Sequence, residues 1–455
     1  MRQVLLDKYS VPVPRYTSYP PANFFNESFT AEKYKDAIIE SNHQNPEHIS
    51  IYIHVPFCYQ MCYYCGCNSQ LLKNEEIVAD YIHALKKEIK MVLPLLDHNR
   101  KVSQIHYGGG TPTSQPVSVL KEINELILSE FDCIENPEIA IECHPGYADE
   151  QYWNDLIDAG FNRISLGIQD FNSMVLQAAN RKVSRLPIEE IVHLLRSKGI
   201  SINMDFIYGL PLQTPESFAE TIQKAILLKP DRVVTFSYAH VPWINELQKN
   251  LEKIGLPSVA TKNQIYETAK EIFIEAGYKT IGLDHFVLPD DELYEALQSK
   301  ALHRNFQGYC TRRTTGQVYA FGITGISQLA TAYSQNTKDI NTYISQVNQG
   351  IYPIAKGYIL NKEEQITRSV ISELMCNYTI NWEVLSKDLA ISIHEIKKAK
   401  NYNEQALSDF AKDGIIEYDE NHISILPDAT PLVRNVAASF DKLITGKENR
   451  YSKSI

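Results

Sequence analysis

The feature that most constrains the fold is an alternation of short apolar, β-branched runs with amphipathic stretches, which begins at Ile49. Apolar residues in the amphipathic stretches recur every three or four positions, and Thr214 with Pro215 has the form of a helix N-cap and first turn. Strands that alternate with helices in this way predict a parallel sheet, either open or curled into a barrel. We expect its strands at 49–55, 104–107, 138–143, 163–168, 202–207, 232–238 and 279–283.

The two ends of the chain follow different patterns. Residues 1–45 lack strong periodicity, and we expect them to form an irregular N-terminal extension near the functional site. Beyond about Tyr352, helical stripes are followed by a segment at 414–425 that has the pattern of a hairpin turning at Asp419 to Asn421. This order is typical of a winged-helix-like unit. We therefore expect a main α/β domain at 46–350 and a smaller, mostly helical lid domain at 351–455.

The charge balance argues against several classes of partner. The 455 residues include 44 basic and 55 acidic side chains, for a formal net charge of -11. This excess of negative charge disfavours attraction to nucleic-acid backbones or anionic membranes, so we interpret the C-terminal unit as a lid and not as a DNA reader. No apolar run approaches the ~18 residues that span a membrane, and residues 1–9 lack the apolar core of a signal peptide. We expect a cytoplasmic protein.

Polar residues repeatedly follow the expected strands. A cysteine-rich loop follows the first strand, a Gly-Gly-Gly-Thr run at 108–111 follows the second, and Glu142 ends the third. Gln169 and Asp205 come at or near the ends of two later strands. Because active sites in parallel α/β proteins lie at the carboxyl ends of the strands, these side chains are expected to meet in one cavity.

Four of the eight cysteines, Cys58, Cys62, Cys65 and Cys67, fall within ten residues. In a chain without an export signal, this clustering favours metal binding over a disulfide framework. Structural zinc usually takes two ligand pairs separated by a longer spacer, whereas one tight loop of thiolates can wrap an iron-sulfur cluster. We favour the cluster, although four close cysteines are compatible with both zinc and iron-sulfur.

The spacing Cys-x3-Cys-x2-Cys after a strand resembles the signature of the radical S-adenosylmethionine superfamily. Further motifs are similar to those of one family within it, the oxygen-independent coproporphyrinogen III oxidases, and they span nearly the whole chain. These motifs are RYTSYP at 15–20, YIHVPFC at 52–58, CGCN at 65–68, GGGTPT at 108–113, GIQDF at 167–171, DFIYGLP at 205–211 and HRNFQGY at 303–309, together with the region 435–441.

The resemblance implies a fold and an activity. The fold would be a partial (βα)6-type, TIM-like barrel of parallel strands. The activity would be the oxygen-independent oxidative decarboxylation of two propionate side chains of coproporphyrinogen III to vinyl groups, which gives protoporphyrinogen IX in porphyrin and haem biosynthesis. The enzyme would use a 5'-deoxyadenosyl radical that takes a hydrogen from the propionate β-carbon, after which the substrate radical loses carbon dioxide and an electron.

The resemblance also implies roles for individual residues. Cys58, Cys62 and Cys65 would hold a 4Fe-4S cluster with one iron left open, Tyr52 would join them as a catalytic residue, and Cys67 would not be a ligand. One S-adenosylmethionine would lie among Tyr52, Tyr64, Gly109, Glu142, Ala239 and Ile326. A second S-adenosylmethionine would be held by Gly110, Thr111, Gln169, Arg181 and Asp205.

The substrate carries four carboxylates, so a basic rim is expected despite the acidic total charge. The candidates are Arg15, Arg304, Arg312 and Arg313, because a guanidinium group can bind a carboxylate through two hydrogen bonds. The implied partners are coproporphyrinogen III and an electron donor such as flavodoxin or ferredoxin, and we expect a monomer.

Two other interpretations remain open from the sequence. A haem chaperone of the same superfamily shares the cluster motif, although CGCN at 65–68 and the segment 15–20 favour the oxidase. A non-enzymatic iron-sulfur or zinc scaffold would need no substrate cavity, and the polar strand ends argue against it.

Overall fold

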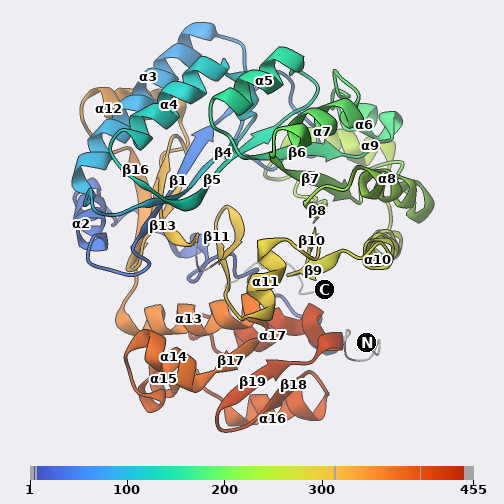
Figure 1. The fold of residues 1–455 in the computed structure, drawn as a ribbon. Coiled ribbons are helices and arrows are strands. Elements are labelled where there is room, and N and C mark those ends of the chain that lie inside the picture. Colours follow the sequence, from blue (N-terminus) through green and yellow to red (C-terminus); the bar gives the residue numbers. More distant parts are fainter. Residues whose placement is uncertain (1–4, 6–7, 312–313, 400, 445–455) are drawn as a thin grey trace.

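The computed structural model describes residues 5, 8–311, 314–399 and 401–444. A large curved sheet with helices on its outer face forms the upper part of the molecule in Figure 1, and a smaller, mainly helical region lies below it. Two of the predicted rim residues, Arg312 and Arg313, lie outside the described residues.

Six neighbouring parallel strands form the centre of the large sheet. In their spatial order they are β1 (His48–Val55), β4 (Val102–Gly109), β5 (Cys133–Cys143), β6 (Arg163–Gln169), β7 (Ser201–Tyr208) and β8 (Arg232–Ser237). Each corresponds to a predicted strand, although β4 and β5 begin earlier than expected. In the described residues the two outermost strands of the sheet do not pair with each other, so the predicted partial (βα)6-type barrel is confirmed and is not closed.

The sheet extends beyond this parallel core on both sides. On one side β13 (Gly316–Phe321) runs parallel to β1, and β14 (Ile326–Gln328), β15 (Ala332–Asn336) and β16 (Ile354–Ile359) follow in antiparallel order. On the other side β10 (His285–Val287) pairs antiparallel with β8 and with β9 (Lys279–Ile281). The predicted strand at 279–283 is therefore present as the shorter β9, which runs in the direction of β8, but it does not pair with β8 because the antiparallel β10 lies between them. Gly282 has φ +62, a conformation that favours glycine, and the short turn 282–284 reverses the chain there.

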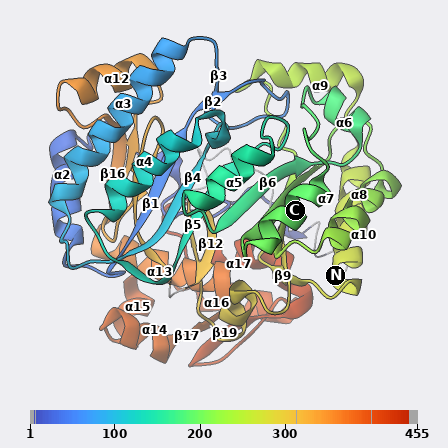
Figure 2. The same cartoon turned by 45° about the horizontal axis from the view of Figure 1, so that its top comes forward.

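The helices that connect the parallel strands cover the outer face of the sheet (Figure 2). The main ones are α3 (Glu75–Val92), α4 (Val117–Leu128), α5 (Glu150–Asp158), α6 (Ser173–Ala178), α7 (Ile188–Ser197), α8 (Pro215–Leu228) and α10 (Val259–Glu275). Thr214 caps α8 as predicted, since its side chain accepts a hydrogen bond from the amide of Ser217. The apolar faces of these helices other than α6 share one core with the sheet, in which Trp153, Phe206 and Phe218 are fully buried.

The C-terminal region has a core of its own around Trp382 and Phe410. It comprises α13 (Lys362–Asn377), β17 (Thr379–Asn381), α14 (Trp382–Leu389), α15 (Ile393–Ala399), α16 (Glu404–Lys412), β18 (Ile416–Tyr418), β19 (His422–Ile425) and α17 (Val433–Ala438). The predicted hairpin at 414–425 is confirmed, because β18 and β19 pair antiparallel. Tyr16 and Tyr19 of the N-terminal segment pack into this core, and the Tyr16 hydroxyl donates to Asp441 at 2.9 Å. The N-terminal segment therefore joins the C-terminal region.

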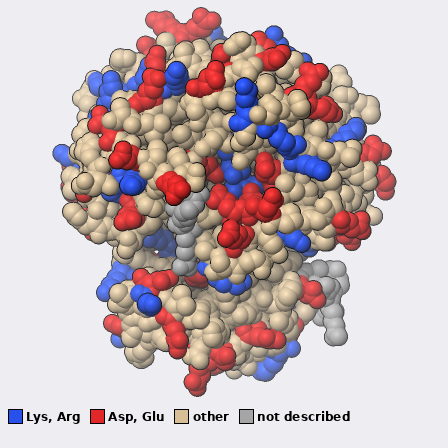
Figure 3. Space-filling view, in the orientation of Figure 1, with Lys and Arg blue, Asp and Glu red and all other residues tan. Residues whose placement is uncertain are grey.

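Shorter elements complete the chain. They are a 3-10 turn at Ala22–Phe24, α2 (Ala31–Ser41), β2 (Phe57–Cys58), β3 (Gln70–Leu71), α9 (Lys249–Ile254), α11 (Glu292–Gln298), β11 (Leu302–Asn305), β12 (Gly308–Thr311) and α12 (Ile340–Asn348). On the face drawn in Figure 3, basic side chains are interspersed with acidic ones. None of the helices in the described part of the chain is long and apolar enough to cross a membrane.

Helix α3 carries a fully buried carboxyl group, Glu88, whose titration should be visible in the stability of the protein. Burial raises the pKa of Glu88 from 4.5 to about 7, although hydrogen bonds from neighbouring groups oppose the rise. Between these two values the native state holds a proton that the unfolded chain has released, so the free energy of unfolding should fall as the pH rises. The fall from this one group should be about 3 kcal/mol at most.

Urea denaturation of the wild type and of Glu88→Gln at about pH 5 and about pH 7.5 measures this contribution. The free energy of unfolding of the glutamine variant is expected to decrease less than that of the wild type between the two pH values. The same decrease in both proteins would contradict the raised pKa.

Candidate active site

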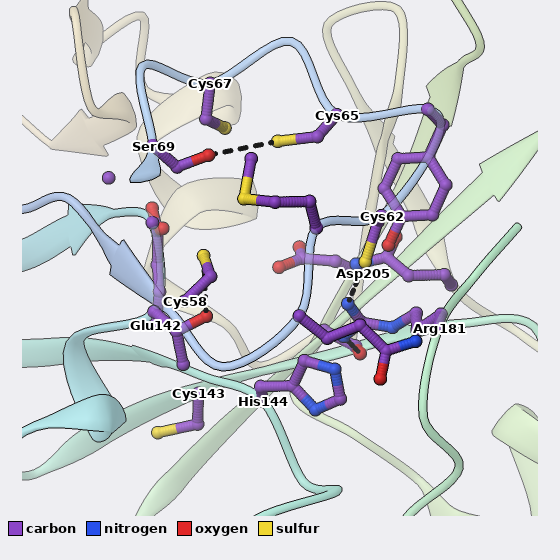
Figure 4. Close-up of a pocket in the computed structure, with 18 of the residues that line it drawn as sticks. Cys58, Cys62, Cys65, Cys67, Ser69, Glu142, Cys143, His144, Arg181 and Asp205 are labelled. Atoms are coloured by element: carbon purple, nitrogen blue, oxygen red, sulfur yellow. Dashed lines mark hydrogen bonds between the residues drawn. The ribbon is translucent and has the colours of Figure 1, made fainter. Parts of the chain in front are cut away.

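A cavity lies at the carboxyl ends of the parallel strands, as predicted from the polar strand ends. It contains about 690 Å³ of space unfilled by protein atoms, part of it open to solvent. Eleven of the predicted site residues line it: Cys58, Cys62, Tyr64, Cys65, Gly109, Gly110, Thr111, Glu142, Gln169, Arg181 and Asp205. Figure 4 shows several of them around the cavity.

The two ends of the cysteine loop pair with each other. The amide of Gln70 donates to the carbonyl of Pro56 at 2.7 Å, and the amide of Leu72 donates to the carbonyl of Cys58 at 2.8 Å. In the middle of the loop, the side chain of Asn180 donates to the carbonyl of Met61 at 2.8 Å. These backbone contacts hold the loop over the end of β1 without using any thiol.

The thiols of the loop have different surroundings. Cys58 is buried beside the Thr111 hydroxyl, 3.3 Å away, and burial raises the pKa of its thiol to about 11. A hydrogen bond with Cys67 is the main cause that lowers the pKa of Cys65 to about 6. Cys67 itself is exposed. Within the described residues, no three Cys, His, Asp or Glu side chains converge on a point where they could share one metal ion, and the four thiols instead surround the cavity.

The glycine run after β4 brings main chain close to the cysteine loop. A Cβ atom added to Gly110 would lie 2.7 Å from the backbone of Pro56 and 3.1 Å from the sulfur of Cys58. The amide of Gly110 donates to the carbonyl of Val55 at 2.8 Å, and the amide of Thr111 donates to that of Phe57 at 2.9 Å. Only glycine permits this approach, so the run forms one wall of the cavity from backbone atoms.

Acidic groups from the central strands face the cavity. Glu142 of β5 accepts from the imidazole of His106 at 3.3 Å, and its side chain remains 44% exposed. Asp205 of β7 accepts from Ser165 at 2.7 Å and from Asn203 at 2.9 Å. Burial raises the pKa of Asp205 to about 6. These carboxylates can accept hydrogen bonds from ammonium or hydroxyl groups of a ligand.

Arg181 and Gln169 form the wall beside the cysteines. The guanidinium group of Arg181 donates to the sulfur of Cys62 at 3.5 Å and to the carbonyl of Gly167. Gln169, at the end of β6, adopts φ +68, and its side-chain oxygen is buried without a hydrogen-bond partner. A buried acceptor without a partner and a left-handed backbone are both costly, and both are typical of a ligand site.

Three predicted site residues lie outside the lining of this cavity. Tyr52 of β1 lies behind the glycine run, where its ring would be 3.1 Å from a Cβ on Gly108 and its hydroxyl is 3.2 Å from His54. The side-chain amide of Gln248 donates to the carbonyl of Ala239 and to the carbonyl of Tyr64, each at 3.3 Å. Ile326 begins β14 and packs near Phe25.

Several groups around the cavity were not predicted. Ser69 lies 3.6 Å from the sulfur of Cys65, and Asn245 donates to the carbonyl of Cys65 at 2.7 Å. His144 lines the cavity, and burial lowers the pKa of its imidazole to about 2, so it is neutral. Of these residues, only His144 had a signal in the sequence, because it directly follows the strand that ends at Cys143. Ser69 lies in the cysteine loop itself, directly after CGCN at 65–68, and Asn245 reaches the site from a distant loop.

Basic side chains meet near the ends of β7 and β10. The Arg304 guanidinium lies 4.9 Å from the centre of the Tyr309 ring. Burial alone would raise the pKa of Asp284, but His285, Arg304 and Arg15 hold it below its ordinary value, so both arginines act on this carboxylate. Lys262 of α10 was not predicted. Its ammonium group donates to the carbonyl of Tyr238 at 2.5 Å, and Arg15 contributes to lowering its pKa after burial.

Comparisons with known proteins agree with this geometry. A model of the radical SAM superfamily matches residues 52–225. The chain is 38% identical to the oxygen-independent coproporphyrinogen III oxidase of Synechocystis sp., with 99% of this chain and 97% of that one covered. For the enzyme of Escherichia coli the identity is 36%, with 97% and 95% covered.

A solved structure of coproporphyrinogen III oxidase from Escherichia coli, described as a radical SAM enzyme, superimposes with a TM-score of 0.88 at 35% identity. The superposition covers 96% of this chain and 98% of that one. The parallel sheet, the three-cysteine loop and these similarities define a radical S-adenosylmethionine enzyme, which uses a 4Fe-4S cluster and S-adenosylmethionine. Within that class, the chain belongs to the family of oxygen-independent coproporphyrinogen III oxidases and is an oxidoreductase.

Proposed function

We propose that this chain converts coproporphyrinogen III to protoporphyrinogen IX by oxidative decarboxylation of two propionate side chains, without oxygen. The observation that carries the proposal is the convergence of eleven predicted site residues on one cavity, in a chain that resembles enzymes of this name over nearly its whole length. The cavity brings together thiols, close-lying backbone and carboxylates, and these groups could hold an iron-sulfur cluster and S-adenosylmethionine.

Cys58, Cys62 and Cys65 are the proposed cluster ligands. Their three sulfurs face the cavity from one loop, which is held by backbone hydrogen bonds and would keep its shape when the thiols bind iron. When bound, the cluster and S-adenosylmethionine supply a 5'-deoxyadenosyl radical, and iron-sulfur potentials down to about -700 mV provide the reducing power. Cys67 also lines the cavity, but it lies outside the Cys-x3-Cys-x2-Cys spacing and is proposed not to be a ligand.

The remaining lining residues divide between two proposed S-adenosylmethionine sites. The carboxylate of Glu142 would accept from the methionyl ammonium group of the first molecule, whose other neighbours would be Tyr52, Tyr64, Gly109, Ala239 and Ile326. The second molecule would be held by Gly110, Thr111, Gln169, Arg181 and Asp205. The buried side-chain oxygen of Gln169, which has no protein partner, supports a ligand on this side of the cavity.

The chain's own contribution to the reaction is positioning. No general base is required, because the hydrogen leaves the propionate β-carbon as an atom. The protein instead fixes that carbon beside the reactive group and excludes water and oxygen. Positioning alone can lower the activation barrier by several kcal/mol, about 7 in well-oriented cases. We infer that the glycine wall and the cysteine loop perform this exclusion.

Arg15, Arg304 and Lys262 are the proposed contacts for the substrate carboxylates. They come from the N-terminal segment, β11 and α10, and Arg15 acts electrostatically on Asp284 and on Lys262. Positive groups from three elements, two of which act on Asp284, would suit a substrate with four negative charges. Arg312 and Arg313 stay candidates on sequence grounds alone.

Other expectations stay proposals. They are an electron donor such as flavodoxin or ferredoxin, a monomeric state, a cytoplasmic location, the absence of nucleic-acid and membrane partners, and the division into residues 1–45, 46–350 and 351–455. The last division meets one complication, since β16 at Ile354–Ile359 still pairs with the large sheet. A boundary near residue 360 would respect that pairing.

Anaerobic reconstitution with iron and sulfide, followed by incubation with S-adenosylmethionine, a reductant and coproporphyrinogen III, tests the proposed function. We expect 5'-deoxyadenosine, carbon dioxide and protoporphyrinogen IX to form together. Binding of haem without release of carbon dioxide would instead indicate a chaperone, and a protein that takes up zinc without sulfide would indicate a scaffold.

A further inference from the structure

The loop between β13 and β14, residues 322–325, connects two parts of the proposed site. Ala320 of β13 lies opposite Tyr52 in the parallel pair with β1, and Ile326 follows the loop directly. Gly322 has φ +92 and Thr324 has φ +57, so two of the four loop residues adopt left-handed conformations. Ile326 is placed by its pairing with Gln335 of β15 and by what holds this loop in place.

A carboxyl group on α3 holds one end of this loop directly and contacts the Asn336 side chain. The backbone beside that side chain also holds the loop, since the amide of Asn336 donates to the carbonyl of Gly325 at 3.0 Å and the amide of Thr324 donates to the carbonyl of Thr337 at 2.9 Å. Glu88 accepts from the amide of Gly322 at 2.8 Å, from the Asn336 side chain at 2.7 Å and from the Tyr343 hydroxyl at 2.5 Å. The Asn336 side chain also donates to the carbonyl of Gly322 at 2.9 Å. Glu88 is 0% exposed, and its hydrogen-bond partners are all neutral. In the described part of the chain it forms no salt bridge.

A second residue on the same face of α3 joins the loop to β1. The Tyr81 hydroxyl donates to the carbonyl of His54 at 2.7 Å and accepts from the amide of Ile323 at 3.1 Å. A Cβ on Gly322 would lie 2.7 Å from the same His54 carbonyl, so the loop and the strand end are in close contact. His54 is four residues before Cys58, and α3 thus fastens the loop to the strand that leads into the cysteines.

A buried carboxylate without a cation is costly, and an apolar side chain would pack a helix onto a sheet without that cost. A functional role would explain this cost, if Glu88 holds a backbone segment whose position affects ligand binding. We propose that Glu88 is a positioning residue for S-adenosylmethionine, which fixes the loop 322–325 so that Ile326 lies against the bound molecule. This inference rests on the proposed function of the site.

The test measures equilibrium binding of S-adenosylmethionine to anaerobic, reconstituted holoenzyme without a reductant, so that the ligand is not cleaved. Glu88→Ala is expected to raise the dissociation constant ~10-fold, because it removes the acceptor of three hydrogen bonds. Glu88→Gln keeps one acceptor oxygen and is expected to restore part of the affinity. Iron and sulfide content should equal that of the wild type in both variants.

Two further variants decide how the result is interpreted. Asn124→Ala is a matched control, because Asn124 is also buried and joins Tyr107 to Ala159 through hydrogen bonds, but it lies on α4, away from the loop. It should lower the melting temperature without changing the dissociation constant, and an equal rise in this control would overturn the proposal. Tyr343→Phe removes only one hydroxyl and should raise the dissociation constant about threefold.

Unchanged affinity in Glu88→Ala would also overturn the proposal. If that variant does not fold, unchanged affinity in both Glu88→Gln and Tyr343→Phe would do so. Failure of the proposed function is distinguishable from these results, because it would appear in the wild type as absence of carbon dioxide release.

Discussion

Replacing any one of Cys58, Cys62 and Cys65 with alanine is expected to abolish formation of 5'-deoxyadenosine. Each sulfur lines the same cavity, and loss of one thiolate would leave the cluster with too few protein ligands to be retained. Iron and sulfide analysis after anaerobic reconstitution should give about four of each per chain for the wild type and far less for each variant. Circular dichroism should show that the variants remain folded, since the loop is held by backbone hydrogen bonds.

Cys67→Ala is the matched control in the same loop. Cys67 is exposed and is not among the proposed ligands, so this variant should retain the iron and sulfide content of the wild type. A fully loaded cluster in Cys62→Ala, or loss of the cluster in Cys67→Ala, would contradict the ligand assignment.

Removing positive charge at the proposed rim should weaken substrate binding selectively. Arg304→Ala and Arg15→Ala are each expected to raise the KM for coproporphyrinogen III roughly 10- to 100-fold, since a hydrogen bond to a charged group contributes about 1.5 to 3 kcal/mol. The KM for S-adenosylmethionine should stay unchanged, because both arginines act on Asp284 and are absent from the lining of the cofactor cavity. Steady-state kinetics with each substrate varied in turn measures both constants.

Arg196→Ala serves as the control for the two rim variants. Its guanidinium group donates to the carbonyls of Leu228 and Lys229 on the helical surface, so its loss should leave both KM values unchanged. An unaltered KM for coproporphyrinogen III in both Arg304→Ala and Arg15→Ala would show that the rim assignment is wrong.

The parallel core could be predicted because its signal is local. β1, β7 and β8 are runs of β-branched and aromatic residues, and each is followed by a helix or loop with its own periodicity. Polar residues such as Glu142 and Asp205 stood out because they interrupt apolar runs near the strand ends. The rule that parallel strands present those ends at one edge was enough to bring them together.

The parts that could not be predicted depend on contacts between distant segments. The strand at Lys279–Ile281 has the composition of a parallel strand, and no local pattern indicates that the short antiparallel β10 lies between it and β8. β13 joins β1 across more than 250 residues of sequence, and no local pattern indicates that partner. From the sequence, Glu88 would be expected on the solvent-facing side of an amphipathic helix, but it is fully buried.

The central claim is that three thiolates hold a cluster with one iron available to S-adenosylmethionine. Electron paramagnetic resonance of the reduced, anaerobically reconstituted protein, recorded before and after addition of S-adenosylmethionine, tests it most directly. The account predicts a 4Fe-4S signal whose shape changes when S-adenosylmethionine is added. Cys67→Ala should give the same signal and the same change. A signal that does not respond to S-adenosylmethionine, from a cluster bound by four cysteines, would contradict the account.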